Sequence, residues 1–320
     1  MNVFPYRKSI RIPEVCFSNM EKTLTITHYH HSGFSCELGQ TLFIFDYWTG
    51  ENGELPEEKR ITPETIGQYE QVYVFISHEH PDHYDQAVYG WNTSGNVRYI
   101  ISYDMPADAM GDRMRPGEIN VLPGGVIVRA FDSTDLGVSF LVEADGVRIF
   151  HAGDLNFWHW RDESTIKEIA EAEDDYNRAL APILQEKIDV AFFPVDPRQG
   201  QMYDAGANTF IMSVKPRLLI PMHFFGRKNI AAEFARHSRT RETNVIALTR
   251  FGEQLALDFE ENGHVTVRLL TPPEAVPPVK MEPILPVIEP MRGTAEVSLE
   301  NLAEGDPFSE SDLPINMNDE

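Results

Sequence analysis

Residues 78–83 read HEHPDH and follow a short apolar segment, 72–77, that predicts a buried strand. Residues two apart on an extended segment project from the same side, so the first two histidines can reach one cation. Pro81 then ends the strand, and the last two side chains can face a neighbouring position. Imidazole and carboxylate groups suit zinc or a similar divalent ion, whereas a solvated histidine-rich turn is the alternative. The four candidate ligands are His78, His80, Asp82 and His83.

Three other apolar segments end in residues of the same kind. TLFIFD ends in Asp46, VRIFHAGD carries His151 and Asp154, and LLIPMH ends in His223. Polar side chains at strand ends are where folds with sheets gather binding and catalytic groups. One such histidine alone is more often structural, but the four strand ends together predict one shared site.

The hydrophobic pattern predicts the elements that position these strand ends. It predicts a β-rich first half, a helix over 163–187 that kinks or breaks near Pro182, and then alternating strands and helices. This order predicts an α/β (α+β) protein with two sheets sandwiched between helix layers. The predicted strands are 23–29, 34–38, 41–46, 72–77, 97–102, 126–131, 138–143, 147–151, 189–195, 217–222, 244–248, 254–259 and 265–270, and the shorter helices are 64–69, 205–214 and 229–237.

Composition divides the chain into three parts. Residues 1–22 form an N-terminal extension, 23–271 form the folded domain, and 272–320 form an acidic, proline-rich tail that we expect to be disordered. The formal charge is −23, of which residues 281–320 contribute ten acidic side chains and one basic one. This acidity disfavours an extended surface for nucleic acid or anionic membranes.

Cysteine content and hydropathy predict a soluble cytoplasmic protein. Cys16 and Cys36 provide no disulfide framework, which fits a reducing compartment. The N-terminal segment lacks the continuous apolar core of a secretory signal, and the chain has no apolar run of 18 residues.

Together, the 78–83 motif and the strand-end residues resemble the metallo-β-lactamase-fold hydrolases, in particular the cytoplasmic metal-dependent group with ascorbate-6-phosphate lactonase-like proteins. The resemblance runs from about residue 25 to residue 223. It implies an αββα sandwich whose cleft binds one or two divalent ions, zinc or else manganese or iron. It implies that His78 and His80 hold the first ion, that Asp82, His83 and His223 hold the second, that Asp154 bridges them, and that Asp46, His31 and His151 support the ligands.

The chain departs from this family where relatives supply a third histidine for the first ion. No histidine lies between His83 and His151, and Asp132 stands where that histidine is expected. We expect Asp132, or else Asp135, to be an oxygen ligand, which would favour harder ions. The alternatives are an incomplete first site and a turn that the two carboxylates cap.

Other residues near the motifs are candidates for catalysis. Asp82 is expected to orient the attacking water, and His159 to protonate a leaving group. Trp158 and Trp160 either line the cleft or anchor the following helix. Arg198 either binds a substrate carboxylate or phosphate or makes a loop salt bridge. His28 and His30 form a second H-x-H pair without a carboxylate cluster, so we expect structural histidines there.

The predicted activity is hydrolysis of a small-molecule ester, lactone or phosphorylated metabolite by a metal-activated water. The partner is therefore a small molecule, with no membrane and with nucleic acid disfavoured, and a homo-oligomer is compatible with the sequence. An RNA or phosphodiester nuclease of the same fold is one alternative. A metal-binding sensor that has lost catalysis is another, because the third histidine is missing.

Overall fold

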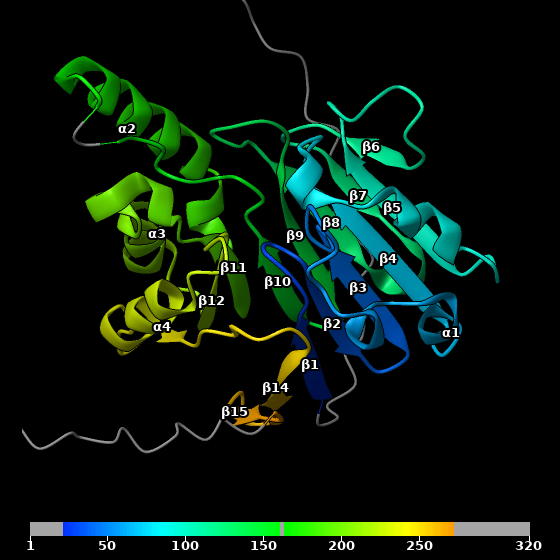
Figure 1. Cartoon of the computed structure of the whole chain (residues 1–320). Coiled ribbons are helices and arrows are strands. Elements are labelled where there is room, and N and C mark those ends of the chain that lie inside the picture. The colour runs from blue at the N-terminus through cyan, green and yellow to red at the C-terminus, as the bar shows by residue number, and fades with distance from the viewer. Residues whose placement is uncertain (1–21, 161–162, 272–320) are drawn as a thin grey trace, which may run out of the picture. The chain divides into compact units, whose positions relative to one another are not determined.

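The computed structural model describes residues 22–160 and 163–271, which lie in one compact unit built on two β-sheets (Figure 1). The predicted tail, and the predicted extension apart from Lys22, lie outside these residues. The first sheet has eight strands in the order β15-β14-β1-β2-β3-β4-β5-β6. They are β1 (Lys22–His28), β2 (Phe34–Leu38), β3 (Thr41–Phe45), β4 (Gln71–Ile76), β5 (Val97–Ser102), β6 (Asp112–Met114), β14 (Glu253–Phe259) and β15 (Val265–Leu269).

The second sheet has seven strands in the order β13-β12-β11-β10-β9-β8-β7. They are β7 (Ile119–Val121), β8 (Ile127–Phe131), β9 (Ser139–Ala144), β10 (Val147–His151), β11 (Val190–Pro194), β12 (Leu218–Met222) and β13 (Asn244–Val245).

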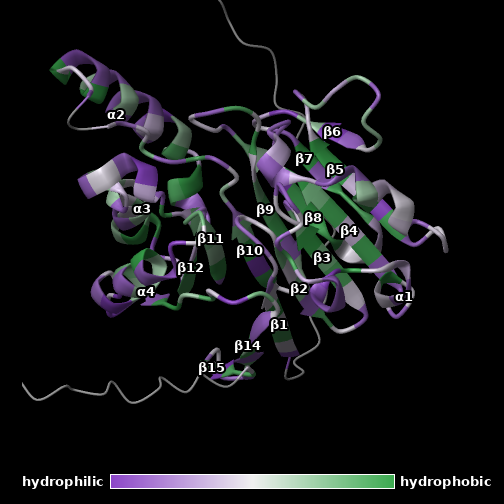
Figure 2. Ribbon diagram, in the orientation of Figure 1, coloured by the Kyte–Doolittle hydropathy of each residue, from purple (hydrophilic) through white to green (hydrophobic). Residues whose placement is uncertain are grey.

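A continuous apolar layer fills the space between the sheets. Phe34 and Phe75 from the first sheet and Phe140 and Phe192 from the second are fully buried in it. The ring centroids of Phe34 and Phe192 lie 4.3 Å apart, and Figure 2 shows the hydrophobic strands on both sides of this layer. Burying one such side chain stabilises the fold by about 1.5–3 kcal/mol. A register slip would turn these rings to the outer faces, so the core fixes where each strand ends.

Helices cover the outer faces of both sheets. On the seven-stranded sheet, α3 (Ala205–Val214) packs on β11 and α4 (Lys228–His237) packs on β12, with α2 (Ile166–Leu180) beyond them (Figure 1). On the eight-stranded sheet, α1 (Pro63–Ile66) and the 3₁₀ segment Gln86–Trp91 cover a second apolar cluster. The predicted αββα sandwich is therefore confirmed.

The elements differ from the sequence-based expectations mainly in length. The break near Pro182 is confirmed, because α2 ends at Leu180 and a separate 3₁₀ turn follows at Ile183–Gln185. Ile166 is 88% exposed although the apolar pattern placed it on the packed face, so the start of α2 does not pack on the sheet. The three-residue strands β6 and β7 were missed because they are too short to show a period. In the described residues, no helix is long and apolar enough to cross a bilayer.

Candidate metal centre

Parallel strand pairing brings several strand ends to one edge of the sandwich. β3 pairs in parallel with β4, and β11 pairs in parallel with both β10 and β12. Ligands of such sheets bind beyond the carboxyl ends of the strands. The polar residues that follow these five strands are Asp46, His78, Asp154, Asp196 and His223.

Three residues at this edge have backbone conformations that L-residues with side chains rarely adopt. The φ angle is 52° at His31, 41° at Asp46 and 62° at His223. Each such residue costs on the order of 1–3 kcal/mol and persists only where the surrounding packing fixes it. Strain of this kind concentrates at functional sites, so its presence at three neighbouring positions marks this edge.

Seven side chains at this edge form two groups in which the donor atoms lie within 4.8 Å of one another. The four-residue group is His31, Asp82, His83 and His223, and the three-residue group is His78, His80 and Asp154. Asp82 and His80 are half-buried and the other five are buried. The structure thus brings together six residues that were predicted as ligands, and it adds His31, which was predicted to support them.

Asp154 joins the two groups. Its Oδ1 lies 3.1 Å from Nε2 of His83 and 3.3 Å from Nε2 of His223, while its Oδ2 lies 3.5 Å from Nε2 of His78. One oxygen therefore faces each group. This position matches the bridging role that the family resemblance implies.

Asp46 orients two of the histidines from behind. Its Oδ2 accepts hydrogen bonds from Nδ1 of His83 at 2.7 Å and from the Ser77 hydroxyl at 2.6 Å. Because the Ser77 proton points to Asp46, the Ser77 oxygen accepts from Nδ1 of His78, 2.9 Å away. Both histidines then carry a proton on Nδ1 and turn Nε2, the atom that can bind a metal ion, toward Asp154.

Asp196 does the same for His223, and the sequence did not predict this. Its Oδ2 lies 3.1 Å from Nδ1 of His223, and its two oxygens accept from Nε of Arg198 at 3.0 and 2.8 Å. In the sequence analysis, a loop salt bridge was one of two roles for Arg198, but no partner was named for it and Asp196 was given no role. A carboxylate directly after an apolar strand was the only signal available.

The donor set fits a divalent cation. Nε2 of His31, His83 and His223 is buried, and no hydrogen bond to these atoms forms within the described residues. With Nδ1 protonated, Nε2 of His83 faces an Asp154 oxygen only 3.1 Å away. Two acceptors this close repel each other unless a proton or a metal ion lies between them.

Electrostatics favours the protonation states that metal binding requires at His78, His31 and Asp154, but it opposes that state at His83. Burial lowers the pKa of His78 to about 3, with His83 adding to the effect. Burial also lowers the pKa of His31 to about 3, assisted by His223. Burial raises the pKa of Asp154, but His83 and His223 outweigh it and hold that pKa well below 3.8. Burial opposes a charge on His83 as well, yet Asp154 and Asp46 raise its pKa well above 6.5, so an entering ion displaces a proton there.

Comparisons with known proteins bear on the fold and on the class of enzyme. No protein-family profile matches the chain. The chain is 23% identical over 234 residues to a UPF0173 metal-dependent hydrolase from Opitutus terrae, a match that covers 66% of this chain and 88% of the relative. It is 27% identical over 226 residues to a UPF0173 metal-dependent hydrolase from Archaeoglobus fulgidus, which covers 63% and 83%.

Igni18, a metallo hydrolase from Ignicoccus hospitalis, superimposes with a TM-score of 0.55 at 18% identity, over 74% of this chain and 100% of that chain. The chain has the metallo-β-lactamase fold of metal-dependent hydrolases. The predicted fold and the predicted class of enzyme are thereby confirmed. The ascorbate-6-phosphate lactonase-like subgroup stays a prediction.

Within this metallo-β-lactamase fold, the structure does not bring Asp132 into either donor group. Asp132 is exposed, and its Oδ1 accepts the N–H of Ser133 at 3.1 Å. The same turn approaches the ligand strand closely further along, because a Cβ on Gly137 would lie 2.0 Å from the Ser77 carbonyl oxygen. The expected oxygen ligand is therefore absent from the donor groups, and Asp132 has the turn-capping position that the sequence left as an alternative.

Two other predicted residues, His151 and His159, lie outside both donor groups. His151 stacks on Phe45, its Nε2 donates to the Ser32 carbonyl at 2.9 Å, and its Nδ1 lies 3.7 Å from Asp46, so it lies behind the ligands as expected. His159 is buried with its ring 4.5 Å from that of Phe157, and it neither belongs to a donor group nor lines the pocket beside Trp158, so its role as a proton donor stays a prediction.

His28 is buried, with Nδ1 3.3 Å from the Arg250 carbonyl oxygen, and neither His28 nor His30 is in a donor group. Both therefore occupy the structural positions that the sequence analysis favoured for this H-x-H pair.

A pocket of about 340 Å³ adjoins the metal centre and is lined by Thr134, Asp135, Trp158, Trp160 and Arg198. Two of these residues also contact the centre. Nε1 of Trp158 donates to the Asp154 carbonyl at 2.8 Å, and Arg198 binds Asp196. We call this space the tryptophan pocket.

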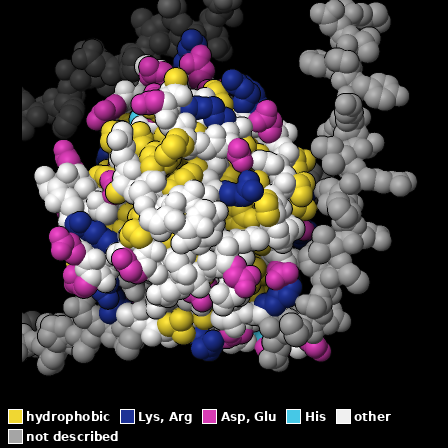
Figure 3. All heavy atoms as spheres, turned by 90° about the vertical axis from the view of Figure 1, so that its right-hand side faces the viewer, with side chains coloured by type: hydrophobic (Ala, Val, Ile, Leu, Met, Phe, Trp, Pro, Cys, Tyr) yellow, Lys and Arg dark blue, Asp and Glu magenta, His cyan; other side chains and the backbone are white. Residues whose placement is uncertain are grey.

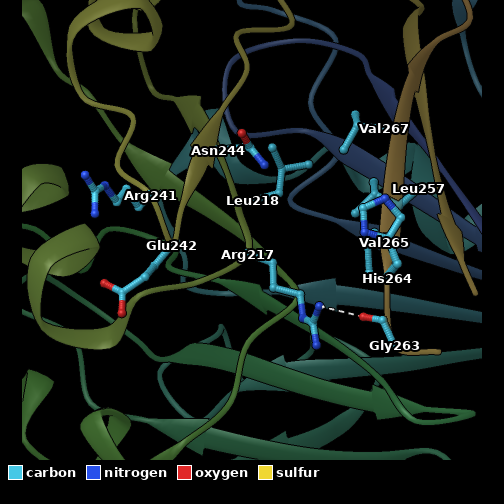
Figure 4. Close-up of a pocket in the computed structure, with 10 residues that line it drawn as sticks. All are labelled: Arg217, Leu218, Arg241, Glu242, Asn244, Leu257, Gly263, His264, Val265 and Val267. Carbon is cyan, nitrogen blue, oxygen red and sulfur yellow. Dashed lines mark hydrogen bonds between the residues drawn. The ribbon is translucent and has the colours of Figure 1, made fainter.

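Another pocket of about 300 Å³ lies at the opposite end of β12 from His223, where Arg217 precedes the strand (Figure 4). Arg217 donates to the Gly263 carbonyl there at 3.1 Å, and Arg241 and His264 also line the space. None of the seven donor residues lines this pocket, so its chemistry is separate from that of the metal centre.

Proposed function

We propose that the protein hydrolyses a small-molecule ester, lactone or phosphorylated metabolite that carries an anionic group. The observation that supports this proposal is the tryptophan pocket, since Trp158 and Arg198 belong both to its wall and to the contacts of the metal centre. A volume of about 340 Å³ is at the small end of the range for ligand pockets, which suits a metabolite.

The two donor groups would hold one or two divalent ions. Five imidazoles and two carboxylates suit zinc, and manganese or iron are alternatives. When bound, such an ion supplies a water of lowered pKa, near ~7 rather than ~15.7, and polarises the substrate oxygen. The half-buried Asp82, whose Oδ2 lies 3.3 Å from Nε2 of His31, would be one of these ligands, and from that position its carboxylate would also orient the attacking water.

Arg198 and the tryptophans would position the substrate. The Arg198 side chain is 52% exposed and binds Asp196 through Nε and Nη2, so its outer edge is available to a carboxylate or phosphate. Trp158 and Trp160 lie nearly parallel, at 16° with ring centroids 6.3 Å apart, and offer flat apolar surfaces beside it. A substrate with an anionic group next to a ring or short apolar part matches this wall.

The test is metal analysis of protein purified without chelator, followed by a screen of lactones, carboxylate esters, phosphate esters and structured RNA. We expect chelator-sensitive turnover of an anionic small molecule. Release of nucleotides would instead support the nuclease. The face shown in Figure 3 does not favour that outcome, because its basic side chains are scattered among acidic ones. Metal binding without any turnover would support the sensor.

A further inference from the structure

We propose that the two donor groups are unequal: the four-residue group, with His31 as a full ligand, is the tight site, and the three-residue group is the open, exchangeable site. The proposal concerns metal binding alone. It therefore stands or falls independently of the substrate class proposed above.

The four-residue group offers a complete set of ligands. It provides three imidazoles and one carboxylate, and four protein ligands close a zinc site. Its imidazoles point inward: Nε2 of His31, His83 and His223 is buried without a hydrogen bond from the described residues. His31 belongs to this set by geometry, because its ring centroid lies 4.1 Å from that of His223 and its Nε2 lies 3.3 Å from Asp82.

Two ligands of this group are also held by carboxylates. Nδ1 of His83 binds Asp46 at 2.7 Å, and Nδ1 of His223 binds Asp196 at 3.1 Å. A carboxylate behind a ligating imidazole fixes its orientation and raises its basicity, which typically strengthens metal binding 10- to 100-fold.

The three-residue group has neither advantage. Its ligands are His78, His80 and Asp154, and three protein ligands leave a position for water or substrate. His78 is held by the Ser77 hydroxyl rather than directly by a carboxylate, and His80 is half-buried. The residue expected to complete this group, Asp132, is exposed on the turn that Gly137 packs against Ser77.

The same atoms give the two groups different tasks. Oδ1 of Asp154 faces His83 and His223, and only Oδ2 faces His78, so the shared carboxylate adds a further donor to the tight site. An ion there would order the edge of the sandwich. The open site, with fewer ligands, is the one at which a substrate oxygen could enter.

The experiment is titration of the full-length, chelator-stripped protein with cobalt(II), followed by visible absorption and by calorimetry, without any substrate. Wild type should bind two ions in two steps at least tenfold apart in affinity. His31→Ala should weaken the tight step at least tenfold, whereas His80→Ala should remove the weak step and leave the tight one within threefold. Circular dichroism checks that each variant is folded. If His31→Ala is not folded, Asp82→Asn, for which we expect the same loss of affinity, is titrated in its place.

Each other result overturns the proposal. Two ions of equal affinity would show that the groups are equivalent. An unchanged tight step in His31→Ala and Asp82→Asn would exclude His31 as a ligand, and loss of the tight step in His80→Ala would place the tight ion in the three-residue group. If wild type binds one ion, that ion must be lost in His31→Ala and kept in His80→Ala.

Discussion

Oδ2 of Asp46 lies 2.7 Å from Nδ1 of His83, and the same oxygen accepts the hydroxyl of Ser77. The buried carboxylate therefore orients ligands of both donor groups, one directly and His78 through Ser77. Asp46→Asn replaces one of these acceptors with an amide donor while it keeps the shape of the side chain. We expect metal affinity to fall roughly 10- to 100-fold, as for other partners of metal-bound histidines.

Competition with a chromophoric chelator measures this change. The control is Asp258→Asn, which removes a carboxylate paired with Arg268 on the surface of the eight-stranded sheet and should leave affinity unchanged. Equal affinities of Asp46→Asn and wild type would show that Asp46 does not act on the ligands.

The backbone contact of Gly137 with the ligand strand gives a second prediction. Gly137 and Gly39 both have positive φ, 77° and 59°, but a Cβ at 137 would lie 2.5 Å from Cβ of His78, whereas nothing lies within 4 Å of one at 39. Gly39→Ala should therefore lower the free energy of unfolding only by the cost of a side chain in the left-handed conformation, about 1–2 kcal/mol. Gly137→Ala should cost more and also weaken metal binding, because Ser77 and His78 must move.

Thermal unfolding together with metal content distinguishes the two glycine variants. If both lost the same stability and both kept full metal, the close approach at Gly137 would have no role in placing His78.

The side chain of Arg198 gives a prediction about the substrate. Charge-assisted hydrogen bonds contribute about 1.5–3 kcal/mol, so Arg198→Ala should raise KM for an anionic substrate by roughly tenfold to a hundredfold. A neutral analogue of the same substrate should show little change. Steady-state kinetics on both substrates checks this, with metal content measured because Arg198 also binds Asp196. Arg217→Ala, at the other end of β12, is the control, and equal effects of the two variants would refute a binding role for Arg198.

The buried imidazole of His28 leads us to predict that the folded protein loses stability in acid. Burial lowers its pKa from 6.5 to about 4, so between these values the unfolded chain binds a proton that the folded chain does not. The stability contributed by the neutral imidazole is complete above pH 6.5 and is lost as pH falls toward 4, up to roughly 3 kcal/mol. His28→Gln keeps a donor for the Arg250 carbonyl but does not titrate.

Urea unfolding at pH 7.5 and pH 4.5 should therefore show a smaller loss of stability in His28→Gln than in wild type. The other histidines titrate in both proteins, so the difference isolates His28. Identical losses would mean that the His28 imidazole accepts a proton within the folded protein.

Local sequence signals were enough to predict most of the centre. The segments around His78, Asp154 and His223 each combine an apolar strand with a ligand-type residue at its end, and both features are visible without a structure. The role of Asp196 was not, because it depends on the parallel pairing of β11 with β12. His31 was predicted only to support the ligands, and the left-handed backbone at this residue of the four-residue group is not visible in the sequence. Asp132 was predicted as a ligand from its position after a strand, but that position does not show that the side chain is exposed.

Anomalous diffraction from crystals grown in excess zinc is the most direct test of the central claim. We predict two ions, one bonded at about 2.0–2.2 Å to the histidines of each donor group, with Asp154 in contact with both. Zinc bound elsewhere, or Asp154 and His223 lying apart from the 78–83 segment, would contradict the account.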